Sequence, residues 1–204
     1  MDVATLIRKV QRRFGDDNSM VITVQDIIDW VNAGQQQIAK ETKCLSTTLS
    51  QNASTFPVTI PSDFLKLERI TYAGLSVPYI SVEELDKLAV DLTYNGAPDY
   101  FYISDEKFYL FPDPANSDTT TVVIYYSKMP ALLTAIVPAY DLLTIPAMLH
   151  EDLVTYVLIS AHERNENWKA VEILTATLTK NLPYRTEDSN VVDDTFPIVR
   201  DGDL

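Results

Sequence analysis

The sequence predicts an α+β protein, in which N- and C-terminal helices form a bundle, a small antiparallel β-sheet or sandwich is inserted between them, and an extended tail follows. Three observations predict this fold. Apolar residues have helical spacing at the start of the chain and again after residue 148, and short aromatic runs bounded by prolines lie between residues 56 and 126. A chain of 204 residues can build one sizeable core, so we expect one continuous body.

We divide the chain into four parts, which form a single structural domain and a tail. Residues 1–44 are the N-terminal helical arm, and residues 45–130 are the β insert with a short helix. Residues 131–182 are the C-terminal helical arm, and residues 183–204 are an extended acidic tail.

The first helix of the N-terminal arm is amphipathic, with an apolar stripe from Val3 to Phe14. Its other faces carry Arg8, Lys9, Arg12 and Arg13. Many DNA-binding proteins use such a cationic helix, but the segment that follows is too long for a helix-turn-helix and the charge of the whole chain opposes DNA binding. We expect these arginines to meet acidic neighbours, on this chain or on an adjoining copy.

The second helix begins after Thr23 and runs to about Lys43. Thr23 followed by Asp26 is typical of a helix N-cap with an acid in the first turn. Gly34 inside this helix costs about 1 kcal/mol relative to alanine, which usually indicates the close approach of a neighbouring element.

The β insert contains short strands near residues 45–50, 58–60 and 67–72, then a short helix near residues 82–89 that Ser81 and Glu84 cap. Residues 100–103 and 108–111 predict a hairpin, and residues 122–126 a third strand that completes its sheet. The hairpin is apolar on both faces, so we expect one face to lie under another strand layer and the other under a helix. The alternative is that a tyrosine-rich face, with Tyr100, Tyr102 and Tyr109, docks on a partner.

The C-terminal arm begins with a helix from Met148 that is apolar on most sides, which predicts the centre of the bundle. After a polar interruption at residues 162–167, a last helix carries one apolar stripe and ends before Pro183. The stripe consists of Trp168, Val171, Leu174 and Leu178.

The tail has too few apolar residues for a core of its own, with six acidic residues against two arginines in residues 184–204. The apolar cluster at residues 196–199 is typical of a segment that becomes ordered on a partner. A tail that packs on its own body, or stays mobile, is the alternative.

Charge and composition exclude several classes of protein. With 29 acidic and 16 basic residues the formal charge is −13, so we do not expect lysine and arginine side chains to bind nucleic acid through its phosphates. Cys44 is the single cysteine, which excludes an internal disulfide and is typical of a packed thiol. The first residues do not form a secretory signal, and no apolar run approaches the ~20 residues that span a bilayer. We therefore expect a cytoplasmic protein without a membrane segment.

No catalytic, cofactor or metal site is expected, and we predict that the protein is not an enzyme. His150 and His162 are twelve residues apart and do not have a metal-binding spacing, so each is interpreted as a surface or satisfied helix residue. A nucleophile elbow, a glycine-rich phosphate loop and a thiol pair are all absent from the sequence. A pair of carboxylates, which is all that a glycosidase needs, stays open among the 29 acidic residues.

Three segments carry a family resemblance: FPVTIPSDFLKLERITYAG, then GAPDYFYISDEKFYLFPDPANSDTTTVVIYYSKMPAL, then IPAMLHEDLVTYVLISAHERNEN. Their order and spacing resemble the head-to-tail adaptor proteins (connector or head-completion proteins) of tailed bacteriophages. The resemblance implies a ring of copies, commonly twelve, that binds beneath the portal and joins capsid to tail in the neck of the virion. It also implies helices around a DNA channel, and a β insert directed outward or toward the tail.

The resemblance also implies partners. The C-terminal extension would grip the portal through Tyr184, Arg185, Phe196, Pro197, Ile198 and Val199. The tail-side partner would be a nozzle, hub or terminator protein. Independently of the resemblance, the basic first helix and the tyrosines of the hairpin predict that neighbouring subunits or the tail contact Arg8, Arg12, Arg13, Tyr100, Tyr102 and Tyr109. The net charge predicts an acidic lumen, through which genomic DNA would pass without being read in sequence.

We expect a monomer in the host cytoplasm that assembles on the portal. Two alternatives remain for the function. The first is a peptidoglycan hydrolase carried in the virion, and the second is a component of the tail tube or tail terminator.

Overall fold

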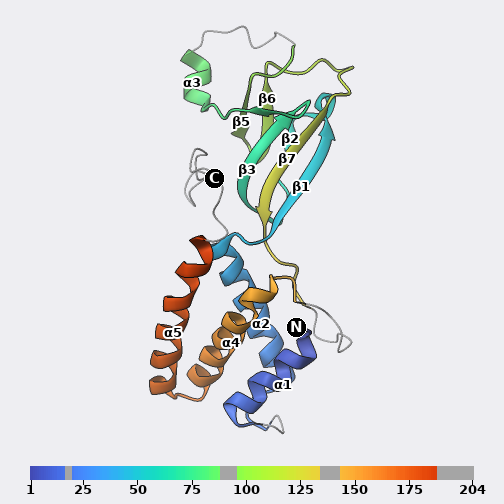
Figure 1. The fold of residues 1–204 in the computed structure, drawn as a ribbon. Coiled ribbons are helices and arrows are strands. Elements are labelled where there is room, and N and C mark those ends of the chain that lie inside the picture. Colours follow the sequence, from blue (N-terminus) through green and yellow to red (C-terminus); the bar gives the residue numbers. More distant parts are fainter. Residues whose placement is uncertain (17–19, 88–95, 134–142, 188–204) are drawn as a thin grey trace. The chain divides into compact units, whose positions relative to one another are not determined.

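The computed structural model describes residues 1–16, 20–87, 96–133 and 143–187 (Figure 1). The described residues fall into two compact units: a helical unit of residues 1–45 and 129–187, and a β unit of residues 46–128. Helices and antiparallel sheets together confirm the predicted α+β class. Whether the two units form one body stays a prediction, and each unit is described by itself.

The helical unit contains α1 (Val3–Phe14), α2 (Val24–Thr42), the short 3-10 helix η2 (Ala147–Leu149), α4 (His150–Arg164) and α5 (Trp168–Glu187). Local sequence explains where its first two helices begin. The Asp2 side chain accepts a hydrogen bond from the Thr5 backbone N–H, and Thr23 and Asp26 form the predicted capping box at the start of α2. Both caps satisfy backbone donors that the first turn of a helix leaves without partners.

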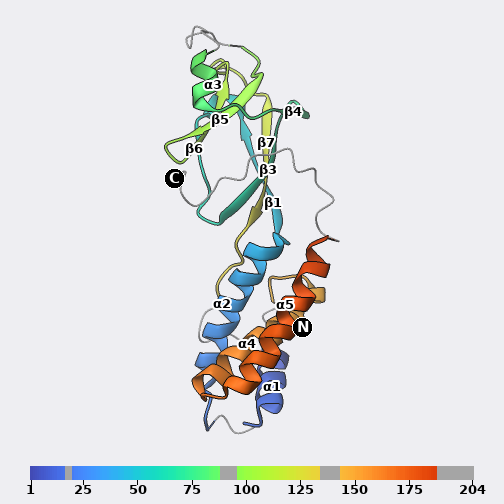
Figure 2. The same ribbon diagram turned by 90° about the vertical axis from the view of Figure 1, so that its left-hand side faces the viewer.

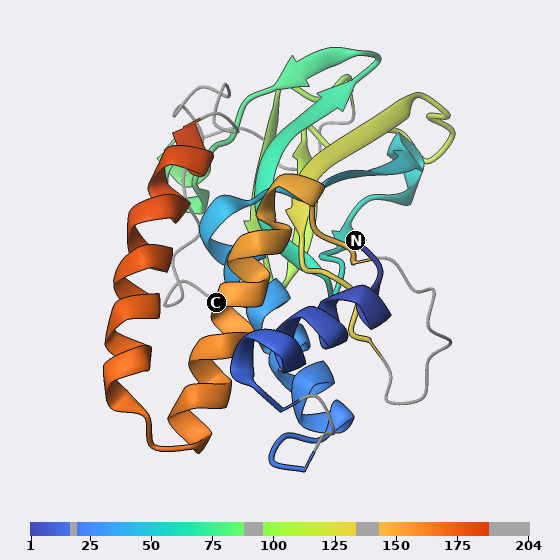
Figure 3. The same cartoon turned by 60° about the horizontal axis from the view of Figure 1, so that its bottom comes forward.

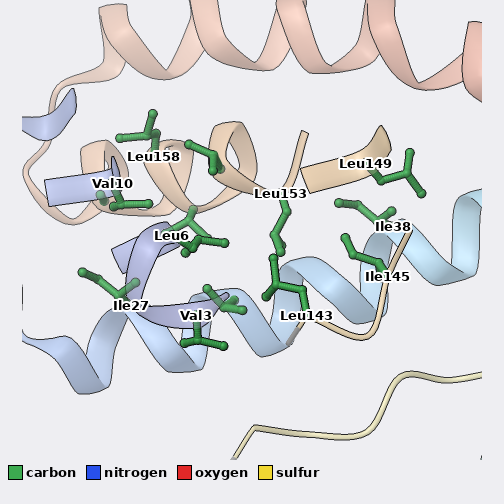
Figure 4. Close-up of a cluster of buried hydrophobic side chains, with 14 of the residues drawn as sticks. Val3, Leu6, Val10, Ile27, Ile38, Leu143, Ile145, Leu149, Leu153 and Leu158 are labelled. Carbon is green, nitrogen blue, oxygen red and sulfur yellow. The ribbon is translucent and has the colours of Figure 1, made fainter. Parts of the chain in front are cut away.

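Helix α4 lies at the centre of the bundle and packs against α1, α2 and α5, as the sequence predicts (Figure 3). The core of the unit forms where α1, α2, η2 and α4 meet (Figure 4). Leu6 of α1, Ile27 of α2 and Leu153 of α4 are fully buried in this core. Burial of such a side chain stabilises the fold by roughly 1.5–3 kcal/mol.

Gly34 lies where α2 and α4 pack closely together. A Cβ atom at this position would lie 2.7 Å from Leu153 Cδ1 and 2.7 Å from Tyr156 Cδ1. A side chain larger than hydrogen would therefore force the Leu153 and Tyr156 side chains to shift, which confirms the interpretation of Gly34 as a contact residue.

The segment that returns from the β unit to α4 is held on α2 by two amide side chains. Asn32 donates from Nδ2 to the Leu133 carbonyl oxygen at 2.9 Å and accepts from the Leu133 N–H at 2.8 Å. The buried Gln35 accepts from the Thr144 N–H at 3.1 Å. Polar groups inside α2 thus satisfy backbone groups of a connection that lies about a hundred residues later in the chain.

Helix α5 differs from the prediction in two ways. It continues past Pro183 to Glu187, so the predicted end before Pro183 is wrong. A proline removes one helical hydrogen bond and strains the preceding turn, but it does not have to end the helix. The second difference is burial: no residue from Trp168 to Asn181 is fully buried, and Trp168 is 64% exposed although the predicted stripe includes it.

The β unit contains two antiparallel sheets. The larger has the order β1 (Ser46–Asn52), β7 (Thr121–Lys128), β3 (Phe64–Tyr72) and β4 (Leu75–Val77). The smaller has the order β2 (Val58–Thr59), β6 (Lys107–Phe111) and β5 (Tyr100–Ser104). The sequence analysis placed β7 in the sheet of the hairpin, which is wrong, because β7 pairs with β1 and β3. Pro112 and Pro114 end the pairing of β6, and the chain then crosses to the larger sheet.

The hairpin β5–β6 forms a middle layer of the β unit, as predicted. On one face Phe101, Phe108 and Leu110 join a core with the larger sheet. On the other face Phe111 packs with Leu85 of α3 (Val82–Lys87), a helix that lies beside the hairpin (Figure 2). Ser81 and Glu84 cap α3 reciprocally, and the predicted continuation of this helix to residue 89 falls outside the described residues.

Candidate assembly surfaces

The basic face of α1 is partly used inside the chain. Lys9 and Arg13 both form ion pairs with Glu151 in the first turn of α4, with Arg13 Nη2 at 3.2 Å from Oε2. The hydrogen bond from Lys9, supported by the charges of Lys9 and Arg13, lowers the pKa of Glu151. The arginines are predicted to meet acidic residues on this chain or on an adjoining copy, and Arg13 meets Glu151 on its own chain.

Arg8 and Arg12 are exposed and point away from the core residues of α1. They are one helical turn apart, so they lie on the same outer face of the helix. Arg8 makes a small contribution to the lowered pKa of Asp2, which comes mainly from hydrogen bonds with Thr5. These two arginines therefore remain candidates for a contact with another chain.

The three candidate tyrosines of the hairpin share one face. Tyr100 is paired with Phe111, and Tyr102 with Tyr109, on the side that α3 covers. The rings of Tyr102 and Tyr109 are stacked, with centroids 4.9 Å apart, and burial raises the pKa of Tyr102. All three side chains are only half-buried, and Tyr100 and Tyr102 pack against the cluster that contains Leu85 of α3. A role for the remaining area in docking stays a prediction.

The predicted portal-binding residues have different positions. Tyr184 and Arg185 belong to the last turns of α5. Phe196, Pro197, Ile198 and Val199 lie outside the described residues. A joint role of these six residues stays a prediction.

The family model described as SU10 adaptor protein matches residues 1–185, and so covers both the helical unit and the β unit. The chain belongs to the SU10 adaptor family. The resemblance to phage head-to-tail adaptors is thereby confirmed. The protein is a structural phage adaptor and a virion component, and its family implies association with portal and tail proteins. No curated protein matches the chain.

The two histidines of the adaptor are parts of helix packing. His150 is buried, with Nε2 at 3.0 Å from the Ile145 carbonyl oxygen and Nδ1 at 3.1 Å from the N-terminal ammonium group, and burial lowers its pKa. The His162 ring lies 5.0 Å from that of Phe14. Within the part of the chain that the structure describes, no group of three or more His, Cys, Asp or Glu residues could hold a metal ion. The family is one of structural adaptors, which are not typically enzymes.

Two further findings concern the cysteine and the apolar character of the helices. Cys44 is half-buried, and burial raises the pKa of its thiol, as expected for a packed residue. In the described segments, none of the helices has the length and apolar character that crossing a membrane requires.

The sequence analysis missed an apolar surface on α5. Trp168 is 64% exposed and Ile173 is 59% exposed, although both belong to the helical unit. A signal for it exists in the sequence, because Ile173 lies off the stripe formed by Val171, Leu174 and Leu178. An isoleucine on the polar side of a helix has no place in the core of its own chain.

Proposed function

We propose that this adaptor forms a ring of copies, commonly twelve in the virion, that binds beneath the portal and joins the capsid to the tail. The match over residues 1–185 carries the proposal, because it includes both compact units rather than one shared helix or sheet. Closed rings of one chain use two different surfaces on each copy. The adaptor would act by occupying the neck of the virion and linking the portal to a nozzle, hub or terminator protein of the tail.

Imaging of the adaptor with and without its cognate portal tests this proposal. We expect single copies in the absence of portal and a complete ring on the portal face. Assembly into stacked tubes without portal would instead favour a tail-tube component. Release of soluble fragments from peptidoglycan, lost on replacement of one carboxylate, would favour the hydrolase.

We propose that the channel of this ring passes DNA without holding it. The support is the formal charge of −13, because an acidic lumen repels phosphates and lets a duplex slide in either direction during packaging and ejection. A filter-binding assay on assembled rings measures this property. We expect weak retention of duplex DNA at low salt, and a tight, salt-sensitive affinity would contradict the proposal.

We propose that the C-terminal segment supplies much of the affinity for the portal. The support is the apolar cluster of Phe196, Pro197, Ile198 and Val199, which charged residues flank and which is too small to form a core. Tyr184 and Arg185 would contribute from the end of α5. A segment that becomes ordered on a partner gives up conformational entropy but covers a long stretch of surface.

Deletion of residues 184–204 tests the portal segment by co-sedimentation with portal rings. A full-length chain with Phe196→Ser and Ile198→Ser is the finer test, and Asp201→Ser with Asp203→Ser is its matched control. We expect the deletion and the apolar double variant to lose most binding, and the control to retain it. Unchanged co-sedimentation of the deletion would reject the proposal.

A further inference from the structure

The outer face of α5 combines exposed apolar side chains with acidic groups. Trp168 and Ile173 are both more than half exposed, and Glu172 lies between them on the first two turns of the helix. The turn before α5 adds the exposed Glu163 and Glu166. Lys169 is the exposed base in this region, while Arg164 is paired with Asp26. Trp168 and Glu172 are one turn apart and lie on the same side of the helix, and Ile173 lies about 140° round the axis from Trp168. The face therefore mixes apolar and charged side chains and is mainly negative.

The outer face of α1 has the opposite character. Arg8 and Arg12 are exposed there, on either side of a helical turn that carries no acidic residue. Lys9 and Arg13 lie beside them, and their charge is shared with Glu151. This face is therefore mainly positive.

The two faces lie on different sides of the helical unit. Helix α4 packs against both α1 and α5, and it separates them in the bundle (Figure 3). The faces therefore cannot meet within one chain. A surface that fits a different surface of the same molecule produces head-to-tail contacts, and such contacts form a ring when the rotation between successive copies closes.

We propose that α1 of one copy docks on α5 of the next, with Arg8 and Arg12 against Trp168, Ile173 and the glutamates around them. This inference rests on the proposed ring and assigns its subunit interface. Arginine can lie over a tryptophan ring and at the same time pair with a carboxylate. Trp and Arg are also the residues most enriched among those that dominate binding energy.

The charges of the two faces allow a reciprocal test. The first variant carries Arg8→Glu and Arg12→Glu, and the second carries Glu166→Lys and Glu172→Lys. Each variant alone brings like charges together at every contact, so we expect ring formation on the portal to fall at least ~10-fold. In an equimolar mixture the copies can alternate, and each contact then joins opposite charges. We expect the mixture to recover rings.

A matched control has the same change in charge elsewhere. Lys40→Glu with Lys87→Glu alters two exposed lysines on α2 and α3 and should leave ring formation unchanged. All variants are first compared with the wild type by circular dichroism and thermal unfolding. The altered side chains are exposed, so we expect each variant to fold.

A cysteine pair tests the same contact without changing charge at both faces. In a Cys44→Ser background, Thr5→Cys and Ala176→Cys are made singly and together, and the chains are oxidised on the portal. Both positions are exposed, and they lie one helical turn from Arg8 and from Glu172, so the proposed contact residues are kept. A head-to-tail contact predicts a ladder of cross-linked multimers from the double variant and monomers from each single variant. Dimers from a single variant would show that identical faces meet, and would overturn the inference.

The outcomes separate this inference from the proposed function. Wild-type rings on the portal together with normal rings from both charge variants would reject the α1–α5 contact and leave the ring intact. Absence of wild-type rings on the portal would reject the proposed function itself. Failure of the mixture to recover rings, when each variant alone is deficient, would also reject the α1–α5 pairing.

Discussion

Helices α4 and α5 follow one another in the chain, but they use their apolar residues in different ways. Leu153, Val154 and Val157 of α4 are fully buried, and the helix touches each of its three neighbours. Helix α5 is longer, and none of its residues from Trp168 to Asn181 is fully buried. Leu174 of α5 packs against the core, while Trp168 and Ile173 face outward.

This difference separates side chains that hold one copy together from side chains that are available to another. A helix that is apolar on most sides has to be covered by neighbouring helices, and α4 is covered by α1, α2 and α5. Trp168 and Ile173 are exposed on a helix whose other side packs against the core through Leu174, so they add little to the stability of the single copy. The comparison predicts that substitutions on α4 change stability and those on the outer face of α5 change assembly.

The largest effect is expected from Leu153→Ala, which leaves a cavity where α4 meets α2. We expect the free energy of unfolding to fall by about 3 kcal/mol, as for other fully buried leucines. Urea unfolding followed by circular dichroism measures the change. Ile173→Ala removes a similar side chain from α5 and serves as the control. Equal losses for the two variants would contradict the comparison.

Gly34→Ala tests how closely α2 and α4 approach. Alanine favours a helix by about 1 kcal/mol over glycine, but its Cβ would lie 2.7 Å from the Leu153 and Tyr156 side chains. We expect the clash to dominate and stability to fall by about 1 kcal/mol. Ala33→Gly, at the neighbouring exposed position, gives the propensity effect alone. A more stable Gly34→Ala variant would show that the helices can separate without cost.

Glu151→Gln removes the carboxylate that joins α1 to the first turn of α4. The pairs are exposed, so we expect a loss of about 0.5 kcal/mol at neutral pH. The pKa of Glu151 is lower in the folded protein than in the unfolded chain, so its contribution is present above about pH 4.5 and disappears as the pH falls further. Unfolding curves of variant and wild type should therefore converge in acid. A difference that persists at pH 3 would contradict this origin.

The smallest effect on the single copy is expected from Trp168→Ala. Because the ring is 64% exposed, we expect the unfolding free energy to change by less than about 0.5 kcal/mol. Ring formation on the portal should decrease markedly in the same variant. Strong destabilisation of the isolated chain would assign Trp168 to folding and remove it from the proposed interface.

Local sequence predicted the parts of the fold that local chemistry determines. The Thr23 and Ser81 caps, the contact at Gly34 and the central place of α4 each depend on a few neighbouring residues or on the period of an apolar pattern. The partners of β7 depend instead on which distant strands meet it. Alternation within residues 121–128 shows which side chains share a face but does not select the sheet.

The candidate surfaces were predicted only in part, for a related reason. Exposure of a side chain is a property of the folded chain, so the stripe that contains Trp168 reads as core until the position of α4 is known. Arg13 and Arg8 cannot be distinguished in the sequence, and only the fold brings Glu151 to one of them. The charge of the chain is visible in the sequence, but the separation of acidic and basic faces is not.

Helix α2 governs how the chain enters and leaves the β unit. The chain leaves the end of this helix at Lys43. The returning segment is hydrogen-bonded through Leu133 to Asn32, about 16 Å back along the same helix axis. Both ends of the inserted segment are thus connected to the same helix. The core of the helical unit is also closed without side chains of the β unit, so the inserted sheets and the helices have separate hydrophobic interiors.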